Sequence, residues 1–270
     1  MRHTVLLSLA CIALATGLLV AQTFFGSIVG TITDSSGASV VSAKVALTNT
    51  ATGERRAATS GADGNYQFVN LIPGLYRVDV ENTGFKHLTR DSVEVQVQAT
   101  VRVDGVMQLG DVGQTVEVGA QIPLLQTETY SLGTVVDQRK VQEMPLNGRN
   151  VLNLVTLVPG VVAQGSALAN PTGLNINSFG NYQINGAIAG QNATFLDGVT
   201  LNVKTNFVAI LPTQDAISEF KVQTNGVGPE FGRIAGGVIN LTSKSGTNQF
   251  HGSGYEFLRN KVLNANNFFQ

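Results

Sequence analysis

Cysteine, tryptophan and histidine are scarce in this 270-residue chain, and their scarcity limits what it can do. The single cysteine, Cys11, lies in an apolar amino-terminal segment, tryptophan is absent, and the three histidines are His3, His87 and His251. A disulfide framework and a cysteine metal site are therefore excluded. Neither an HExxH nor a GxSxG motif occurs, and the sequence predicts no cluster of histidine with carboxylates. The sequence consequently predicts no enzyme, no metal site and no cofactor.

Charge is scarce as well, at 13% of residues with a net charge of -1. Soluble globular domains carry about 25% charged residues, and nucleic-acid-binding domains carry a basic excess, so this composition argues against a nucleic-acid partner. Glycine is abundant at 30 residues, which favours strands and turns over helical bundles. A chain of this length has room for about two domains.

The first residues have the pattern of an export signal. Arg2 and His3 give a short positive start, residues 5–20 are apolar or small, and a cleavage site ends at Ala21. Residues 1–21 are therefore predicted to be a secretory signal peptide. A retained membrane anchor is the alternative, but the apolar run is shorter than the ~20 residues of a spanning helix. A lipoprotein signal would use Cys11, and there Ser8 departs from the lipobox pattern.

Residues 24–109 are predicted to form an all-β domain. Segments of alternating apolar and polar residues, such as Leu75–Glu81, are separated by the turns Asp63-Gly64-Asn65 and Pro73-Gly74. Strands at this regular spacing indicate a β-sandwich. The strings GSIVGTITDSSGASVVSAKVALTNTATG and DGNYQFVNLIPGLYRVDVENTGF resemble the carboxypeptidase regulatory-like domain, a transthyretin-like or immunoglobulin-like sandwich. The resemblance implies a structural or interaction module without peptidase activity; a secreted carbohydrate-binding module is an alternative that no residue identifies.

Residues 110–125 are predicted to link this domain to the next. Within them, Thr115, Val116, Glu117 and Val118 resemble a TonB box, the extended segment that outer-membrane receptors present to the inner-membrane energy transducer TonB. An exposed β-prone segment can add a strand to a partner's sheet, mainly through backbone groups. The alternatives are that this segment is the last strand of the sandwich or part of a plain linker.

Residues 126–248 are predicted to mix short helices and strands. Helices are expected at Val136–Met144, with Asp137 near its start, at Val151–Val158, and directly after Thr213. Strands are expected at Tyr182–Asn185, Thr194–Val199, Phe220–Thr224 and Val238–Thr242, with Asp197-Gly198 as a turn. The charge-poor stretch Gln164–Ser178 is predicted to be a mobile loop.

Five glycines lie between the last two of these strands, which implies a backbone that takes positive φ or packs closely against a neighbour. A phosphate-binding loop is disfavoured because neither a P-loop lysine nor a GxGxxG pattern is present. The strings MPLNGRN, INGAIAGQNATFLDGVTLN and PEFGRIAGGVINLTSK resemble the plug domain of TonB-dependent outer-membrane receptors. Asp197 and Arg233 are interpreted as a turn aspartate and a buried arginine, not as reactive groups. The plug motif falls on Asp197, Gly198, Phe231, Gly232, Arg233, Gly236 and Gly237.

Residues 249–270 are predicted to begin an outer-membrane β-barrel, with Phe250–Arg259 as its first strand. A transmembrane strand needs ~9–11 residues and plugged transporters have ~22 strands, so we expect the chain to be a fragment of a longer protein. The order of segments is similar to the Oar-like branch of these receptors.

This resemblance implies a mainly β protein of the outer membrane, in which a plug gates TonB-driven nutrient uptake and the sandwich lies in the periplasm. Its partners would be TonB, outer-membrane lipid around the barrel, and a ligand such as a glycan or a metal chelate. A surface adhesion protein and a soluble periplasmic binding module are the alternatives.

Overall fold

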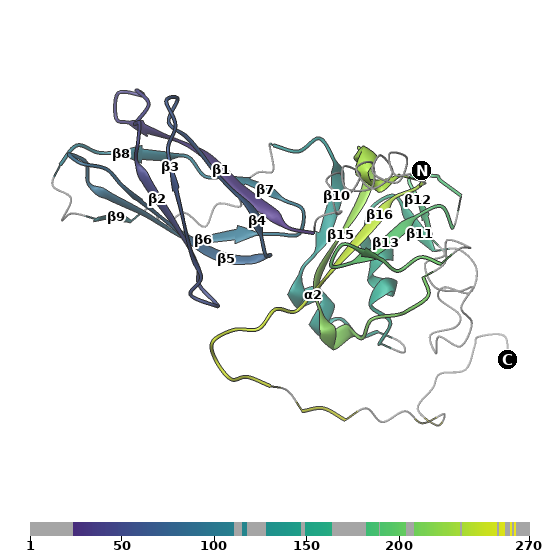
Figure 1. Cartoon of the computed structure of the whole chain (residues 1–270). Helices are drawn as coiled ribbons and strands as arrows, with labels where there is room; N and C mark the ends of the chain where they lie inside the picture. The colour runs from purple at the N-terminus through teal and green to yellow at the C-terminus, as the bar shows by residue number, and fades with distance from the viewer. Residues whose placement is uncertain are drawn as a thin grey trace, which may run out of the picture.

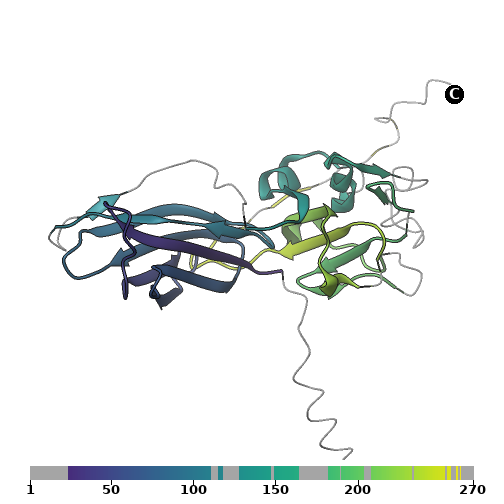
Figure 2. The same cartoon turned by 90° about the horizontal axis from the view of Figure 1, so that it is seen from above.

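The computed structural model describes residues 24–110, 115–117, 128–146, 149–163, 182–188, 190–203, 208–232, 234–252 and 254–256, together with Asn260 and Val262. These residues form two units that lie side by side, a β-sandwich and an α+β unit (Figure 1 and Figure 2). The expected signal peptide and the expected loop at Gln164–Ser178 lie outside the described residues. Within the described ranges, no helix is long and apolar enough to cross a membrane.

Two sheets make up the sandwich. One contains β1 (Gly26–Asp34), β4 (Asn65–Leu71), β7 (Thr100–Arg102) and β8 (Gly105–Met107), with β1 between β4 and the other two. The second has the order β3-β2-β5-β6-β9 and consists of β2 (Lys44–Asn49), β3 (Arg55–Thr59), β5 (Gly74–Glu81), β6 (His87–Val95) and β9 (Thr115–Glu117). Strands such as β1 bury alternate residues, and the buried side chains of both sheets form one apolar core. The predicted β-sandwich is confirmed.

The second unit is built on a mixed five-stranded sheet of order β10-β15-β16-β13-β14. Its strands are β10 (Leu132–Val136), β13 (Ala193–Leu196), β14 (Val199–Thr200), β15 (Ile217–Asn225) and β16 (Val238–Ser243). Strand β16 is antiparallel to β15 and parallel to β13. A separate antiparallel pair consists of β11 (Val161–Ala163) and β12 (Tyr182–Ile184). The four expected strands are present, although the one expected at Thr194–Val199 ends at Leu196, and β10, β11 and β14 are additional ones.

The helices of the second unit are shorter than expected. Helix α2 (Gln138–Glu143) begins after Asp137, whose carboxylate accepts the Lys140 N–H at 3.0 Å, so Asp137 is its N-cap and Val136 belongs to β10. The helix expected after Thr213 is a single 3-10 turn, η6 (Gln214–Ala216), without a side-chain cap from Thr213.

The helix expected at Val151–Val158 is a 3-10 helix, η3 (Val151–Leu157), capped by the Asn150 side chain. The segment is rich in β-branched residues, which lose χ1 freedom in an α-helix and lower its propensity there. A further 3-10 turn, η7 (Pro229–Phe231), lies within the glycine-rich crossing between β15 and β16.

The main sheet of the second unit has an apolar face and a polar face. The apolar face packs against α2 and η3 and includes Phe220, Val222, Ile239 and Leu241. Side chains alternate along a strand, so the opposite face carries the buried polar residues of β15 and β16, namely Glu219, Lys221, Gln223, Asn240 and Thr242. We call these five residues the polar face. The turn of the sandwich at Val97 and Gln98 contacts this face.

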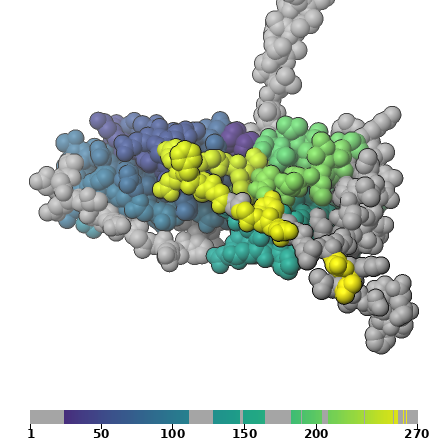
Figure 3. Space-filling view, turned by 90° about the horizontal axis from the view of Figure 1, so that it is seen from below, coloured from purple at the N-terminus to yellow at the C-terminus, as the bar shows by residue number. Residues whose placement is uncertain are grey.

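The chain that follows β16 forms no strand among the described residues of 244–256. Residues 250–252 and 254–256, the described part of the strand expected at Phe250–Arg259, therefore form no strand, because a β-strand requires a hydrogen-bonded neighbour and no described residue pairs with them. The segment instead returns along the sandwich, where the Asn248 N–H donates to the Ala51 carbonyl at 3.2 Å and the Asn248 side chain donates to the Thr52 carbonyl. Figure 3 shows the carboxy-terminal segment lying across both units.

Candidate functional site at the junction of the two units

The glycine-rich crossing ends in two positions that have no room for a side chain. A Cβ atom on Gly236 would lie 2.1 Å from Asn192 Oδ1, and one on Gly237 would lie 2.5 Å from Ile184 Cγ2 and 2.6 Å from the Gln223 carbonyl oxygen. Neither glycine has a positive φ. Close packing therefore requires glycine at both positions, and the neighbours belong to the second unit itself.

Two other glycines of the crossing, Gly226 and Gly232, differ in backbone conformation and in the space around them. Gly226 has a φ of +65°, and a Cβ there would lie 2.8 Å from the Tyr130 carbonyl oxygen. Gly232 has an ordinary φ of -55°, and a Cβ there would have no atom within 4 Å. The expectation of positive φ or close packing thus holds at Gly226 and fails at Gly232.

Phe231 anchors the crossing between β15 and β16. Its side chain is buried, and its ring centroid lies 5.5 Å from that of Phe195 at a tilt of 56°. Val238 at the start of β16 completes this small apolar cluster. Arg233, the next charged residue of the predicted motif, lies outside the described residues.

Asp197 and Gly198 form the two-residue turn between β13 and β14, where Leu196 pairs with Val199. Their φ values are +48° and +80°, the left-handed values that a type I′ hairpin turn requires. The Asp197 carboxylate accepts the Ser243 N–H at 2.9 Å. Asp197 therefore ties the hairpin to the end of β16, in agreement with its interpretation as a turn residue.

Thr115, Val116 and Glu117 form β9, which pairs in parallel with residues 87–89 of β6. This is the last-strand alternative for the segment, and β9 is the outermost strand of its sheet. Val118 lies outside the described residues. A short outermost strand is held by one neighbour only, and its other edge can pair with another chain.

The sandwich contacts the polar face through the turn between β6 and β7. The Val97 N–H donates to Glu219 Oε1 at 2.6 Å, and the Lys221 ammonium donates to the Gln98 carbonyl at 3.1 Å. The Asn240 amide donates to Gln98 Oε1 at 2.6 Å. Gln98 has a φ of +51°, so the turn presents both its backbone and its side chain to the sheet.

Burial at this contact changes the acid–base behaviour of two groups. Desolvation raises the pKa of Glu219 to about 7, aided by the negative charges of Glu94 and Asp137 and opposed by the hydrogen bond from Val97. Desolvation also lowers the pKa of Lys221. Both effects arise because the sandwich excludes water from charged side chains, which disfavours the charged form.

Two further polar groups of the polar face are buried without a hydrogen bond. Among the described residues, Gln223 Oε1 and Thr242 Oγ1 have no hydrogen-bond partner. A buried polar atom left unpaired costs about 1–3 kcal/mol. A cleft of about 490 Å³ lies beside the contact and includes Gln223 and Gln98 in its lining. Two buried oxygen atoms of the polar face therefore remain without a hydrogen bond.

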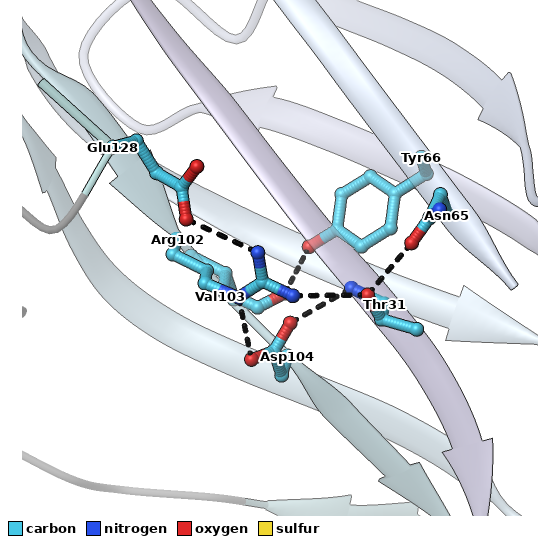
Figure 4. Close-up of polar contacts among 7 residues, drawn as sticks. All are labelled: Thr31, Asn65, Tyr66, Arg102, Val103, Asp104 and Glu128. Atoms are coloured by element: carbon cyan, nitrogen blue, oxygen red, sulfur yellow. Dashed lines mark hydrogen bonds and ion pairs between the residues drawn. The ribbon is translucent and has the colours of Figure 1, made fainter.

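A second contact joins the start of the second unit to the sandwich (Figure 4). The Arg102 guanidinium lies 3.1 Å from Glu128 and 3.0 Å from Asp104, and it donates to the Thr31 hydroxyl at 3.1 Å. Hydrogen bonds to Asp104 and Glu128 raise the pKa of Arg102. All of these groups are partly exposed, so they orient the chain more than they stabilise it.

A third cluster fixes the chain after β16 to the second unit. Arg149, from the MPLNGRN string, lies 2.7 Å from Asp215 Oδ1, and the Tyr255 hydroxyl donates to Asp215 Oδ2 at 2.6 Å. The Arg149 guanidinium also lies 4.7 Å from the centroid of the Tyr255 ring. The hydrogen bond from Arg149 contributes most to lowering the pKa of Asp215. The segment entering the predicted barrel is thus tethered at Tyr255.

Sequence reasoning identified the glycines, Phe231 and the Asp-Gly turn, but it missed the polar face. Polar residues at every second position of β15 indicate a solvent-facing side, and no local signal shows that another domain lies on it. The role of Arg149 was missed for the same reason, because Asp215 and Tyr255 are distant in sequence.

Within the described residues, no group of three or more histidine, cysteine, aspartate or glutamate side chains is placed to bind a metal ion.

Two regions of the chain match known protein families. Residues 27–108 match the carboxypeptidase regulatory-like domain. The sandwich belongs to this family. Residues 242–270 match an outer membrane beta barrel domain, which agrees with the predicted start of a barrel.

The chain is also 29% identical over 257 residues to the TonB-dependent transporter Oar of Myxococcus xanthus. The alignment covers 90% of this chain and 23% of Oar, so the chain spans about a quarter of its relative's length. The expected resemblance to Oar-like, TonB-dependent receptors is confirmed, and with it the outer-membrane location.

Solved structures resemble the chain only slightly. Catechol 1,2-dioxygenase from Pseudomonas arvilla C-1 is 13% identical, with a TM-score of 0.29 over 40% of this chain and 59% of that one. A putative carbohydrate binding protein from Bacteroides uniformis is 20% identical, with a TM-score of 0.27 over 30% of this chain and 40% of that one. Similarities at this level support no conclusion about function.

Proposed function

We propose that this chain is the amino-terminal part of a TonB-dependent outer-membrane receptor, with residues 126–248 as the plug that gates energy-dependent uptake of a nutrient. The observation that carries the proposal is the similarity to Oar over 90% of the chain. The order of the segments supports it, because an α+β unit follows the sandwich and adjoins the barrel match that begins at residue 242.

One property of the second unit suits a plug. Its crossing from β15 to β16 is tightly packed at Gly236 and Gly237, so a pull on this unit would be transmitted as a movement of the whole sheet. A plug must withstand such a pull without losing its own fold.

The partner on the inner side would be TonB, bound by Thr115–Val118. Strand addition uses backbone groups and tolerates many side chains. Strand β9 is paired with β6 over three residues only, so its exchange from β6 to a strand of TonB would break few hydrogen bonds. The sandwich would then hold the TonB box until TonB binds.

The test is binding of the purified carboxy-terminal domain of TonB to variants at Val116. Val116→Pro removes a backbone donor and fixes φ, so strand pairing should be lost. Val116→Ala is the matched control and should bind as the wild type does. Unchanged binding by Val116→Pro would contradict the TonB-box assignment. Loss of the sandwich's thermal transition in Val116→Pro would indicate that β9 is only a structural strand.

Nutrient uptake is tested in the full-length protein in cells. A glycan or a metal chelate taken up by these cells should accumulate in the wild type and fail to accumulate when the proton gradient is collapsed, while binding at the cell surface persists. Surface binding without energy-dependent accumulation would instead favour an adhesion protein.

A further inference from the structure

The sandwich contains a cavity that the transport role does not use. Its volume is about 270 Å³, and it opens between the two sheets beside β8. Core residues of β1, β4, β5 and β6, together with one residue between β7 and β8, form the wall, so the cavity reaches the centre of the domain. These residues are Ile32, Tyr66, Val78, Val80, Leu88 and Val103.

An interruption of the sheet edge creates the opening. Strand β1 pairs with β7 at residues 27–29 and with β8 at residues 32–34. Between these ladders the Asp104 carboxylate accepts the Thr31 N–H at 2.8 Å, and the Tyr66 hydroxyl donates to the Val103 carbonyl at 2.7 Å. A Cβ on Gly30 would lie 1.9 Å from that carbonyl oxygen. The break between β7 and β8 is therefore held in place by specific contacts, shown in part in Figure 4.

Arg90 stands at a position that points between the sheets. On β6 it is two residues from the buried Leu88, and it pairs with the buried Val78 of β5. Ser92, with a φ of +58°, then resets the alternation, so that Val93 is buried again. An arginine at an inward position of a sandwich is unusual, because its charge must be solvated or paired.

No partner for this charge lies among the described residues. Arg90 lines the cavity, and its guanidinium makes no hydrogen bond or ion pair with a described residue. Asp104, which carries a carboxylate and also lines the cavity, is bound by Arg102 at 3.0 Å and by the Thr31 N–H. The cavity thus combines an apolar interior with one unpaired cation.

We propose that this cavity binds a small monocarboxylic acid, with its aliphatic or aromatic body between the sheets and its carboxylate on Arg90. Arginine and carboxylate are complementary in charge and in bidentate geometry. The size agrees, since an apolar cavity of about 150 Å³ binds benzene and this one is larger. The site is independent of the proposed plug and TonB box.

The test uses isothermal titration calorimetry on the purified chain, with octanoate and 1-octanol as probes. Octanoate should bind the wild type more tightly than 1-octanol. Arg90→Gln should weaken octanoate binding about tenfold, the order expected for one charge-assisted pair, and should leave 1-octanol unchanged. Arg77→Gln is the matched control, because Arg77 lies on the neighbouring β5 but is paired with Asp79, and it should behave as the wild type does.

Filling the cavity gives a second, independent readout. Val80→Phe should abolish binding of both probes, and Val106→Phe at the exposed rim should do so if Val80→Phe does not fold. Equal affinity of the wild type for octanoate and 1-octanol, or an Arg90→Gln variant that binds octanoate normally, would overturn the assignment. Absence of octanoate binding to the wild type would overturn it as well.

Discussion

The two units of this chain bury their side chains in different ways. The sandwich encloses its apolar residues between two sheets of its own. The main sheet of the second unit has one apolar face, covered by its own helices, and one polar face, where Glu219, Lys221 and Asn240 contact the sandwich. The sandwich is therefore complete by itself, whereas part of the polar face of the second unit is covered by a neighbouring domain.

This difference indicates that the two units can separate. A polar face loses little when it returns to water, because water satisfies the same hydrogen bonds. Breaking an apolar contact of equal area would cost about 25 cal/mol for each Å² exposed. The contact through Val97 and Gln98 is therefore of a kind that can open at a small cost in free energy.

The largest effect is expected from Gly237→Val, which acts inside the second unit. The new side chain would overlap Ile184 and the Gln223 carbonyl, so we expect a loss of about 3 kcal/mol in the free energy of unfolding of this unit. Gly232→Ala is the control and should change stability little, since that position is open. Chemical denaturation of the purified chain measures both; a Gly237→Val unit as stable as the wild type would refute the close packing.

A smaller effect is expected from Glu219→Gln, which acts at the contact between the units. The docked state raises the pKa of Glu219 from 4.5 to about 7, so docking retains a proton that the separated state loses. The contribution of Glu219 to docking should therefore be strongest below pH 4.5, weaken as the pH rises to 7, and stay constant above that. The change amounts to roughly 2 kcal/mol, since one pKa unit corresponds to about 1.4 kcal/mol and the site is only partly desolvated.

Glu219→Gln keeps an acceptor for Val97 but cannot ionise, so its docking should not vary between pH 5 and 7. Hydrogen exchange of the Val97 amide, corrected for the intrinsic rate, reports docking directly. We expect more protection in the variant than in the wild type at pH 8. Identical pH profiles for the two proteins would show that Glu219 does not control docking.

The smallest effect is expected from removing the second unit altogether. Residues 24–117 retain both sheets of the sandwich and its core. We expect this fragment to unfold cooperatively at pH 8, with a midpoint within about 5 °C of that in the whole chain, because at that pH the contribution of Glu219 is lost and the remaining contacts are worth at most about 1 kcal/mol to the sandwich. A broad, non-cooperative transition in calorimetry would mean that the sandwich needs its neighbour.

Much of this architecture is predictable because its signals are local. Alternation in Leu75–Glu81 and the Asp63-Gly64 turn specify a sandwich before any contact is known. Asp197 and Gly198 specify a hairpin because few residue pairs accept two positive φ values. The interruption between β7 and β8 and the inward position of Arg90 depend instead on which strand lies opposite, and sequence alternation alone does not determine that.

The candidate site was predictable only in part, because some of its residues carry a local signal and others depend on long-range contacts. Gly236 and Gly237 carry a visible signal, but the reason for glycine there, contact with Asn192 and Ile184, is a long-range fact. Glu219 and Lys221 look like solvent-facing strand residues in the sequence. Their role appears only when Val97 and Gln98, more than a hundred residues away, are placed against them.

Cross-linking tests the central claim most directly, namely that the sandwich lies on the polar face. The side chains of Gln98 and Asn240 are in contact at 2.6 Å, so a Gln98→Cys/Asn240→Cys chain, with Cys11→Ser, should react rapidly with a short thiol-specific cross-linker. The control pair Gln98→Cys/Lys140→Cys places the second thiol on α2, against the opposite face of the sheet. We predict efficient cross-linking of the first pair and little of the second. Equal yields for the two pairs would contradict the docked arrangement.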